Sequence, residues 1–494
     1  MSQSISAGRV AALVGDFDRS PAYAGLADAL RELVGDGRIG YDTRLPSERD
    51  LTEALGVSRT TVTRAYAALR ETAYAEARQG SGTFTRLPGG AIRSFDRALL
   101  PTDSGPDAIS LTCAASSAPP GIHAAYADAV ADLPAQLGGP GYYPAGLPEL
   151  RAAIARRYDD RGLPTRPEQV IVTTGALAAL AVVGQALAGP RDRIMVESPT
   201  YPNAVQALKS GGGRVLTVPL DRDGWDLDHL TDLVARRRPR LAYLMPDFQN
   251  PSGLVMSASL RRDYARLLQR HQSVAVVDEA HQPLSLAEHP STTAPFAALA
   301  KDAVTVGSTS KTIWGGLRIG WIRSPVGLVD ELTQARVGLD LGAPVLEQLV
   351  VARLLDDGYD AILASNRARL REQRDVLVAE LREHLPEWRF RVPDGGMVLW
   401  CELPEARSTA LVQEVDRLGL HLAPGPAFAP EGGLDRFLRV PYTVPPDRLR
   451  EAVRRLATAW AAVSGDDRHG GRGRRTGASG SAGSGGSVDP VLVA

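Results

Sequence analysis

Residues 303–318 read AVTVGSTSKTIWGGLR, and this stretch is the best guide to the fold of the 494-residue chain. Its first residues form a short apolar run that is typical of a buried strand. The run leads directly into small hydroxylated residues around Lys311, and Arg318 follows seven residues later. We therefore expect Lys311 to stand at the end of a buried strand, close to several hydrogen-bond donors.

Lysine is rare in this chain, which singles out Lys311. Only three of the 56 basic residues are lysines, and all the others are arginines. An arginine cannot lose its proton and form an imine, whereas a lysine can. Lys209 and Lys301 have the surroundings of ordinary surface residues. Lys311 instead fits an imine with an aldehyde whose phosphate group is bound by three neighbouring donors: Ser308, Ser310 and Arg318.

A nucleotide-binding phosphate loop is the main alternative for this stretch. Such a loop needs a glycine directly before the lysine and another glycine five residues earlier. Here Ser310 precedes Lys311, and Gly307 stands at the wrong distance. The sequence therefore favours the aldehyde cofactor over a nucleotide.

Three further segments carry groups that suit such a cofactor and indicate pyridoxal 5′-phosphate. Asp278 ends a second buried strand, and its carboxylate can keep a pyridine nitrogen protonated or simply cap a turn. Asn250 can donate to a phenolate oxygen, although Asn-Pro is also an ordinary turn signal. Residues 169–180 read QVIVTTGALAAL, a strand, a glycine turn and a helix, and they offer backbone N–H groups as an anion site: Thr174, Gly175 and Ala176.

Composition and length narrow the class of protein. A chain of 494 residues is expected to form two or three domains. The formal net charge of -1 means that attraction to nucleic acid must come from a local basic patch. Cys113 and Cys401 have no partner spacing, which predicts a cytoplasmic protein without disulfides and without a metal site. We see no signal segment and no apolar run of membrane-spanning length, and we expect no membrane association.

The pattern of apolar residues and turns divides the chain into four parts. We predict a helical unit that ends in a hairpin over 16–86, a linker over 87–107 and an α/β domain over 108–463. In the α/β part, short β-branched runs alternate with longer amphipathic stretches, which predicts a mainly parallel sheet. Residues 464–494 are rich in Gly, Ser and Arg and are expected to be disordered.

The first part has the pattern of a helix-turn-helix. We expect a helix that ends near Gly35, a second helix capped by Ser47 and a third capped by Ser58. The third helix, up to Arg70, has no acidic residue, and its cations and hydroxyls lie away from its apolar face. A recognition helix needs this arrangement because its first turns enter the major groove of DNA. The alternative is a small interaction module with a solvated arginine face.

Three motifs of this part resemble the GntR family of winged helix-turn-helix proteins: LPSER at 45–49, VSRTTV at 57–62 and GSGTF at 80–84. The resemblance implies binding to paired half-sites on double-stranded DNA. One departure is ETAYA at 71–75, where the family usually has Glu-Gly-Tyr-Leu, and we expect it to weaken the packing between helix and wing. By position, the resemblance implies DNA contacts from the helices and the wing: Arg49, Arg59, Thr60, Thr61, Arg64, Gln79 and Gly80.

The larger part resembles the fold-type I aminotransferases. Its motifs occur in order over almost all of 108–463: YPAGLPELR at 143–151, TG at 174–175, PTY at 199–201, NPSG at 250–253, Asp278, SK at 310–311 with Arg318, GGM at 395–397 and LRV at 438–440. The whole chain therefore looks like a MocR/GabR-type regulator. The expected fold is an α/β, fold-type I, PLP-dependent aminotransferase-like domain preceded by a small winged helix-turn-helix domain.

The resemblance to aminotransferases also implies roles for individual residues. Tyr201 would stack on the cofactor ring, and Arg439 would bind the α-carboxylate of an amino acid effector by a two-pronged contact. Such proteins are similar in being homodimers with sites at the subunit interface, where Tyr142 or Tyr143 would reach the cofactor phosphate of the partner subunit.

His281 is a departure from the aminotransferase pattern. The family usually has a tyrosine two or three residues after the aspartate, bonded to the phenolate oxygen, and here those positions hold Ala280 and His281. A histidine can supply the same donor with a different charge, or it can be a satisfied buried residue. We include His281 among the cofactor-binding candidates.

Two functions fit this sequence. The first is a transcription regulator that senses an amino acid, an amine or pyridoxal phosphate itself through the aminotransferase-like domain. The alternative is an active aminotransferase with an accessory DNA-binding head, because the main catalytic groups are present. A cofactor-free dimerisation scaffold conflicts with the joint retention of Lys311, Asp278 and Asn250.

Overall fold

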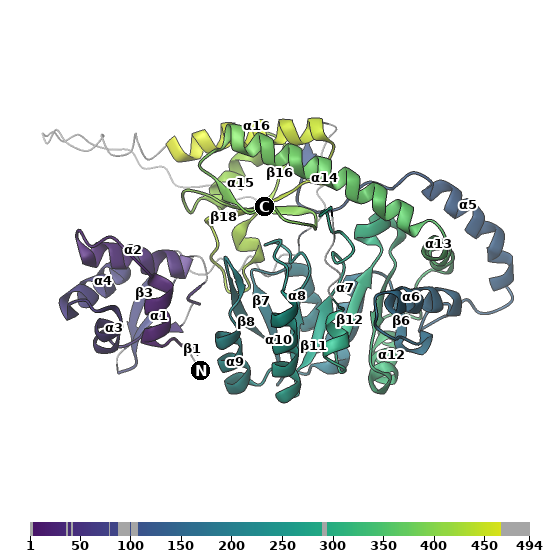
Figure 1. The fold of residues 1–494 in the computed structure, drawn as a ribbon, viewed down its shortest axis with the longest axis horizontal. Helices are drawn as coiled ribbons and strands as arrows, with labels where there is room; N and C mark the ends of the chain where they lie inside the picture. Colours follow the sequence, from purple (N-terminus) through teal and green to yellow (C-terminus); the bar gives the residue numbers. More distant parts are fainter. Residues whose placement is uncertain are drawn as a thin grey trace, which may run out of the picture.

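The computed structural model describes residues 3–35, 38–40, 43–78, 80–86, 99, 107–288 and 294–465. A small N-terminal domain, the head, lies at one end of a larger α/β body (Figure 1). The body consists of a domain around a large sheet and a smaller C-terminal domain around a second sheet. Within these ranges, no helix has both the length and the apolar character that crossing a bilayer requires.

The head is a helical domain with a four-stranded sheet. Its sheet has the order β1-β2-β4-β3. Ser47 and Ser58 accept hydrogen bonds from the backbone N–H groups of Asp50 and Thr61, which confirms both predicted helix caps. Its elements are α1(Ala7–Val14), α2(Ala22–Gly35), α3(Glu48–Leu55), α4(Arg59–Glu71), β1(Gln3–Ser4), β2(Thr43–Arg44), β3(Ala75–Arg78) and β4(Gly82–Thr85).

Helix α1 was not anticipated from the sequence. Val10 and Val14 of this helix lie in the same core as Leu30 of α2 and Leu69 of α4. The predicted start of the first domain at residue 16 therefore leaves out a helix that packs into this core. At the other end of the chain, residues 464 and 465 continue the last helix.

The body contains an eight-stranded, mainly parallel sheet in the order β6-β13-β12-β11-β10-β7-β8-β9. β13 runs antiparallel to both of its neighbours, and β9 runs antiparallel to β8. The predicted parallel α/β architecture is confirmed. The strands are β6(Val170–Thr173), β7(Arg193–Ser198), β8(Arg214–Asp221), β9(Gly224–Trp225), β10(Leu241–Leu244), β11(Val274–Asp278), β12(Val304–Ser308) and β13(Gly320–Arg323).

Helices cover both faces of this sheet (Figure 1). Side chains on one strand alternate between the two faces, so Ala242 and Leu244 of β10 join one core while Leu241 and Tyr243 join the other. The helices of this domain are α5(Ile122–Asp132), α6(Pro148–Asp160), α7(Ala176–Leu187), α8(Pro202–Leu208), α9(Leu227–Arg237), α10(Ala258–Arg270), α11(Phe296–Leu299), α12(Val329–Val337) and α13(Val345–Asp356), with short turns at Leu133–Gln136, Pro167–Gln169, Lys209–Gly211, Ser310–Trp314, Gly315–Leu317 and Val326–Leu328.

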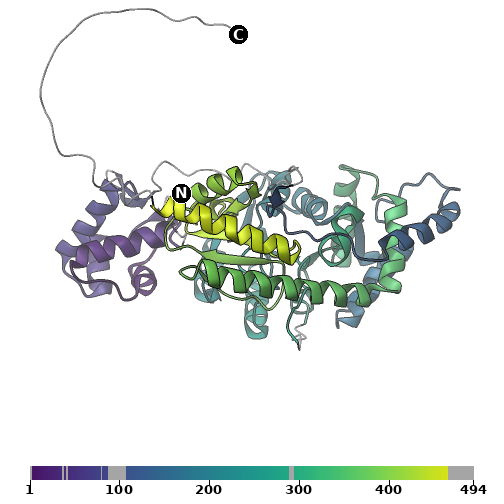
Figure 2. The same ribbon diagram turned by 90° about the horizontal axis from the view of Figure 1, so that it is seen from above.

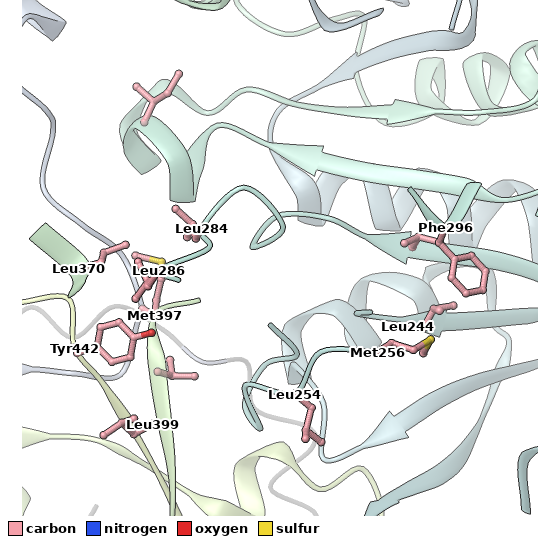
Figure 3. Packing of buried hydrophobic residues seen from close by; sticks show 14 of the residues in the cluster. Leu244, Leu254, Met256, Leu284, Leu286, Phe296, Leu370, Met397, Leu399 and Tyr442 are labelled. Carbon is pink, nitrogen blue, oxygen red and sulfur yellow. The ribbon is translucent and has the colours of Figure 1, made fainter. Parts of the chain in front are cut away.

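The C-terminal domain packs a second sheet, in the order β14-β15-β18-β17, against two long helices that lie side by side (Figure 2). One hydrophobic core joins it to the first domain of the body. Figure 3 shows Leu254 and Leu284 of the first domain with Met397 and Tyr442 of the second. Its elements are α14(Tyr359–His384), α15(Ser408–Arg417), α16(Pro446–Gly465), β14(Arg389–Phe390), β15(Val398–Glu402), β17(Ala423–Pro424), β18(Phe437–Pro441), a short turn at Gly425–Phe428, and the pair β5(Ile109–Ser110) and β16(Leu420–His421).

Candidate functional site

The predicted cofactor residues gather at one edge of the large sheet. β6, β7, β10, β11 and β12 run in the same direction, so their carboxyl ends meet at this edge. A cavity of about 240 Å³ lies there. Its lining includes the following sequence-predicted residues: Ala176, Tyr201, Asn250, Asp278, His281, Ser308, Ser310, Lys311, Arg318 and Arg439. Thr174 and Gly175 contact Arg318 at the rim of this cavity.

Lys311 lies in the helical turn Ser310–Trp314 directly after β12. Its amine donates a hydrogen bond to the carbonyl of Ala114 (2.6 Å). Burial lowers the pKa of Lys311 to about 8, and the positive charge of Arg439 acts in the same direction, while Cys113 and Asp278 oppose it. About a tenth of this amine is therefore neutral, and thus nucleophilic, at pH 7.

Asp278 ends β11 and faces the same cavity. Its carboxylate accepts hydrogen bonds from the hydroxyl of Tyr243 and from the backbone N–H of Ala280, both at 2.9 Å. Burial raises the pKa of Asp278, and these two donors and Lys311 partly oppose the shift. The two donors hold the carboxylate in place, as a partner for a ring nitrogen requires.

The backbone around Arg318 shapes the predicted phosphate-binding end of the cavity. Arg318 adopts a left-handed conformation (φ 53°), and its guanidinium donates to the carbonyl of Thr174 (2.7 Å). Gly175 has a φ of 103°, which residues with a Cβ atom rarely adopt, and it faces that guanidinium, so glycine suits this position beside Arg318. The hydroxyl of Ser308 donates to that of Ser310 (3.0 Å). Hydroxyls, a guanidinium and the start of α7 together form a donor set that fits a phosphate.

Arg439 is buried on β18, and its side chain lines the same cavity as Lys311. Its guanidinium donates to Asn250 Oδ1 (3.4 Å) and to the carbonyl of Thr112, and it lies over the ring of Phe428. Its Nε atom is buried and has no hydrogen-bond partner within the described part of the chain. The described chain therefore leaves one donor of this buried guanidinium unsatisfied.

His281 is buried at the cavity, and its Nδ1 lies 3.3 Å from the carbonyl oxygen of Phe248. Burial lowers the pKa of His281 to about 3, and nearby Lys311 acts in the same direction, so the ring is neutral at ordinary pH. A carbonyl can only accept, so Nδ1 carries the hydrogen and Nε2 is an acceptor. In this state His281 cannot donate as the family's tyrosine does.

Sequence reasoning missed two buried residues that shape this site. Tyr243 holds Asp278, and Glu197 on β7 accepts hydrogen bonds from Trp225 (2.8 Å) and from Gln249 (3.1 Å), the residue before Asn250. Burial raises the pKa of Glu197 to about 8, against the effect of these donors. The sequence did contain a signal for Tyr243 and Glu197, because a polar group that continues an apolar strand must find hydrogen-bond partners. The sequence does not show which partners the fold supplies.

The predicted DNA-contacting residues lie on α3, α4 and the wing of the head. Arg49, Arg59, Thr60 and Arg64 are exposed, and Arg64 lies over the ring of Tyr23 at 3.6 Å. Thr61 is half-buried, and its hydroxyl bonds with that of Ser58 (2.8 Å) as part of the helix cap. Gly80 is exposed in the turn between β3 and β4, whereas Gln79 lies outside the described residues.

In the described ranges, no group of three or more His, Cys, Asp or Glu side chains is placed to hold a metal ion.

Comparison with known families matches residues 22–85 to "Bacterial regulatory proteins, gntR family" and residues 129–456 to "Aminotransferase class I and II". Fold and site thus define a fold-type I aminotransferase domain that carries a GntR winged helix-turn-helix head.

Relatives of two kinds support this assignment. The 2-aminoadipate transaminase of Thermus thermophilus is 34% identical over 64% of this chain and 79% of its own length. The probable rhizopine catabolism regulatory protein MocR of Rhizobium meliloti is 30% identical over 78% of this chain and 82% of its own. The chain belongs to the MocR-type regulators of the GntR family, whose larger domain is a class I and II aminotransferase domain.

Solved aminotransferase structures share the fold of the body. The crystal structure of LysN, the α-aminoadipate aminotransferase of Thermus thermophilus, complexed with N-(5′-phosphopyridoxyl)-L-leucine, has a TM-score of 0.67 and 30% identity. The match covers 72% of this chain and 93% of that one. The kynurenine aminotransferase of Pyrococcus horikoshii has the same TM-score and 25% identity, and the match covers 73% of this chain and 92% of that one.

Proposed function

We propose that this regulator binds pyridoxal 5′-phosphate at Lys311 and senses an amino acid or amine that enters the same cavity. One observation carries the proposal: the amine of Lys311 and the guanidinium of Arg439 line one cavity, and Nε of Arg439 is buried there without an acceptor in the described chain. The carboxylate of an amino acid would supply that acceptor.

The donor set supports the cofactor assignment. Lys311 would hold the aldehyde carbon, and Asp278 would hold the ring nitrogen while Asn250 and Tyr201 contact the ring. The phosphate would be bound by Ser308, Ser310, Arg318 and the backbone of Thr174, Gly175 and Ala176. When bound, the cofactor supplies an electrophilic carbon and an electron-withdrawing ring. The phosphopyridoxyl ligand of the LysN complex agrees with this assignment.

Operator recognition would require two heads, and therefore a dimer. Leu137, Tyr142, Leu339 and Leu341 expose 70%, 63%, 50% and 44% of their surface. The backbone of Gly342 packs against that of Tyr143, so these two apolar segments adjoin. Adjoining apolar segments of this kind support a homodimer interface at this surface. Tyr143 donates to Gln136 (2.9 Å), which leaves the exposed Tyr142 as the better candidate to reach a partner subunit.

A working aminotransferase is the second candidate function. It is favoured by the presence of Lys311, Asp278 and Arg439 in one cavity and by similarity to a transaminase. Formation of keto acid over many turnovers would support the enzyme. A single turnover or none, together with a change in DNA affinity, would support the regulator.

The proposal is tested with Lys311→Ala and the matched control Lys301→Ala, which removes an exposed lysine. Purified proteins are incubated with pyridoxal phosphate, reduced with borohydride and mapped by peptide mass, and DNA binding is measured in parallel. We expect an adduct on the wild-type peptide that contains Lys311, which the control keeps and Lys311→Ala loses together with its response to amino acids. An adduct elsewhere, or an unchanged response in Lys311→Ala, would contradict the proposal.

A further inference from the structure

Leu99 comes from the segment predicted to link the head to the α/β domain, yet it lines the cofactor cavity. Its backbone N–H donates to Asn203 Oδ1 (2.7 Å), and Asn203 Nδ2 donates to the Leu99 carbonyl (3.0 Å). Asn203 lies in the first turn of α8, and its side chain is also a hydrogen-bond partner of the Tyr201 phenol. Leu99 is therefore tied to the part of the cavity that carries Tyr201.

A second segment, Thr112–Ala114, also lines the cavity. The Thr112 carbonyl accepts from Arg439, and the Ala114 carbonyl accepts from the Lys311 amine. Lys311 and Arg439 are the two cations that the proposed function assigns to the cofactor and to the effector carboxylate. A cofactor joined to Lys311 would displace the Ala114 carbonyl, whereas a carboxylate bound through Nε of Arg439 would leave the Thr112 carbonyl on its own nitrogen. Because the two carbonyls belong to one short stretch of backbone, a shift at Ala114 would be felt at Thr112.

The charges of the cavity narrow the class of effector. In the described lining, the cations are Lys311, Arg318 and Arg439, and each already has a role in binding the cofactor or the α-carboxylate. Asp247 is engaged by Arg261 in an ion pair. Much of the remaining lining is apolar and includes Leu99, Leu177, Leu180 and Met245. A second carboxylate on the effector would therefore lack a counter-charge from this subunit and would need one from the partner subunit of the proposed homodimer.

We propose that Leu99 is a specificity-determining residue that contacts the side chain of an amino acid effector with an apolar side chain. Asn203 is a positioning residue for Leu99, because its two hydrogen bonds hold the backbone of Leu99 at the cavity. This inference rests on the proposed function, since it requires the cofactor at Lys311 and the effector carboxylate at Arg439.

Selectivity is tested on the full-length protein loaded with pyridoxal phosphate. The absorbance of the pyridoxal group is followed during titration with L-leucine, L-alanine or L-glutamate. We expect L-leucine to act at concentrations at least about tenfold lower than L-glutamate, and Leu99→Ala to weaken L-leucine about tenfold while L-alanine changes far less. A preference for L-glutamate, or an unchanged response of Leu99→Ala to L-leucine, would overturn the role of Leu99.

The positioning role is tested with Asn203→Ala in the same absorbance titration. L-Leucine should act on this variant only at concentrations about tenfold higher than on the wild type, as for Leu99→Ala, whereas L-alanine should change far less. Ser210→Ala is the matched control, because it removes a hydrogen bond to Ala181 (2.9 Å) just beyond the other end of the same helix. A response of Asn203→Ala to L-leucine equal to that of the wild type would overturn this positioning role and leave the proposed function intact. No absorbance response of the wild-type protein to any amino acid would overturn both.

Discussion

At the scale of single residues, the lowered pKa of Lys311 sets the pH at which the site reacts. With a pKa of about 8 in place of 10.5, the amine is neutral several hundred times more often at pH 7 than an ordinary lysine. We predict that capture of pyridoxal phosphate by the apoprotein accelerates up to about pH 8 and then levels off. Stopped-flow absorbance would measure this, with N-acetyl-lysine as a control that continues to accelerate at higher pH.

The same shift affects stability with a definite sign. The unfolded chain binds the Lys311 proton more tightly than the folded chain does, so the apoprotein loses stability as the pH falls from about 10.5 to about 8. Lys311→Met should remove this part of the pH dependence. An apoprotein whose stability is the same at both pH values would argue against a buried amine with a lowered pKa.

Ala73 holds a backbone conformation that suits glycine. Its φ is 59°, directly after α4 ends, in the ETAYA segment that departs from the glycine-containing pattern of the GntR family. We predict that Ala73→Gly stabilises the head by about 1 kcal/mol, because the left-handed region is unfavourable for a residue with a Cβ. Thermal or denaturant unfolding would measure it. Ala67→Gly, inside α4, is the control and should destabilise by a similar amount.

The site residues that could be predicted share a sequence signal. Asp278 and Lys311 each follow a buried apolar run, and this local pattern places them at the same sheet edge. Arg439 and Tyr201 came from the family resemblance. Tyr243, Asn203 and Leu99 could not be assigned roles, because their partners are 35 and 104 residues away in the sequence and only the assembled fold brings them together.

At the scale of elements, the exposed N-terminal half of α4 is the surface that we propose to contact DNA. Arg59 is exposed, with Glu48 at 3.8 Å as an ion-pair partner. If Arg59 contacts a phosphate, Arg59→Ala should weaken binding to all DNA sequences alike and reduce the slope of log K against log salt by about 1. Mobility shifts at several salt concentrations would measure both. Arg70→Ala, at the other end of α4, should leave the slope unchanged.

The elements themselves were predictable to the extent that they are locally encoded. Ser47 and Ser58 marked the starts of α3 and α4 correctly, because a capping hydroxyl acts on its own next turn. Helix α1 has only two buried residues, Val10 and Val14, and so gives little periodic signal. The antiparallel direction of β13 depends on its pairing with β12 and β6. No local sequence pattern encodes that pairing.

At the scale of the whole molecule, the exposed apolar segments around Leu137 and Leu339 are expected to be covered by another protein surface. If they form the interface between two copies, Leu339→Glu should convert a dimer into a monomer, because it places a charge in an apolar contact. Sedimentation velocity would measure the change. Leu418→Glu, at an exposed leucine in the C-terminal domain, is the control and should keep the wild-type mass. A dimeric Leu339→Glu protein would place the interface elsewhere.

The order of strands in the large sheet also means that the head can fold before the body while the chain is being synthesised. Among the described strands, β6 pairs only with β13, although about 150 residues of chain separate them. The core of the head, by contrast, draws only on residues between Ile5 and Ala75. During synthesis, the head can therefore be folded while β6 of the body still lacks its partner strand. The head of a nascent chain would be present before the body, which carries the proposed dimer surface and the proposed effector cavity, is complete.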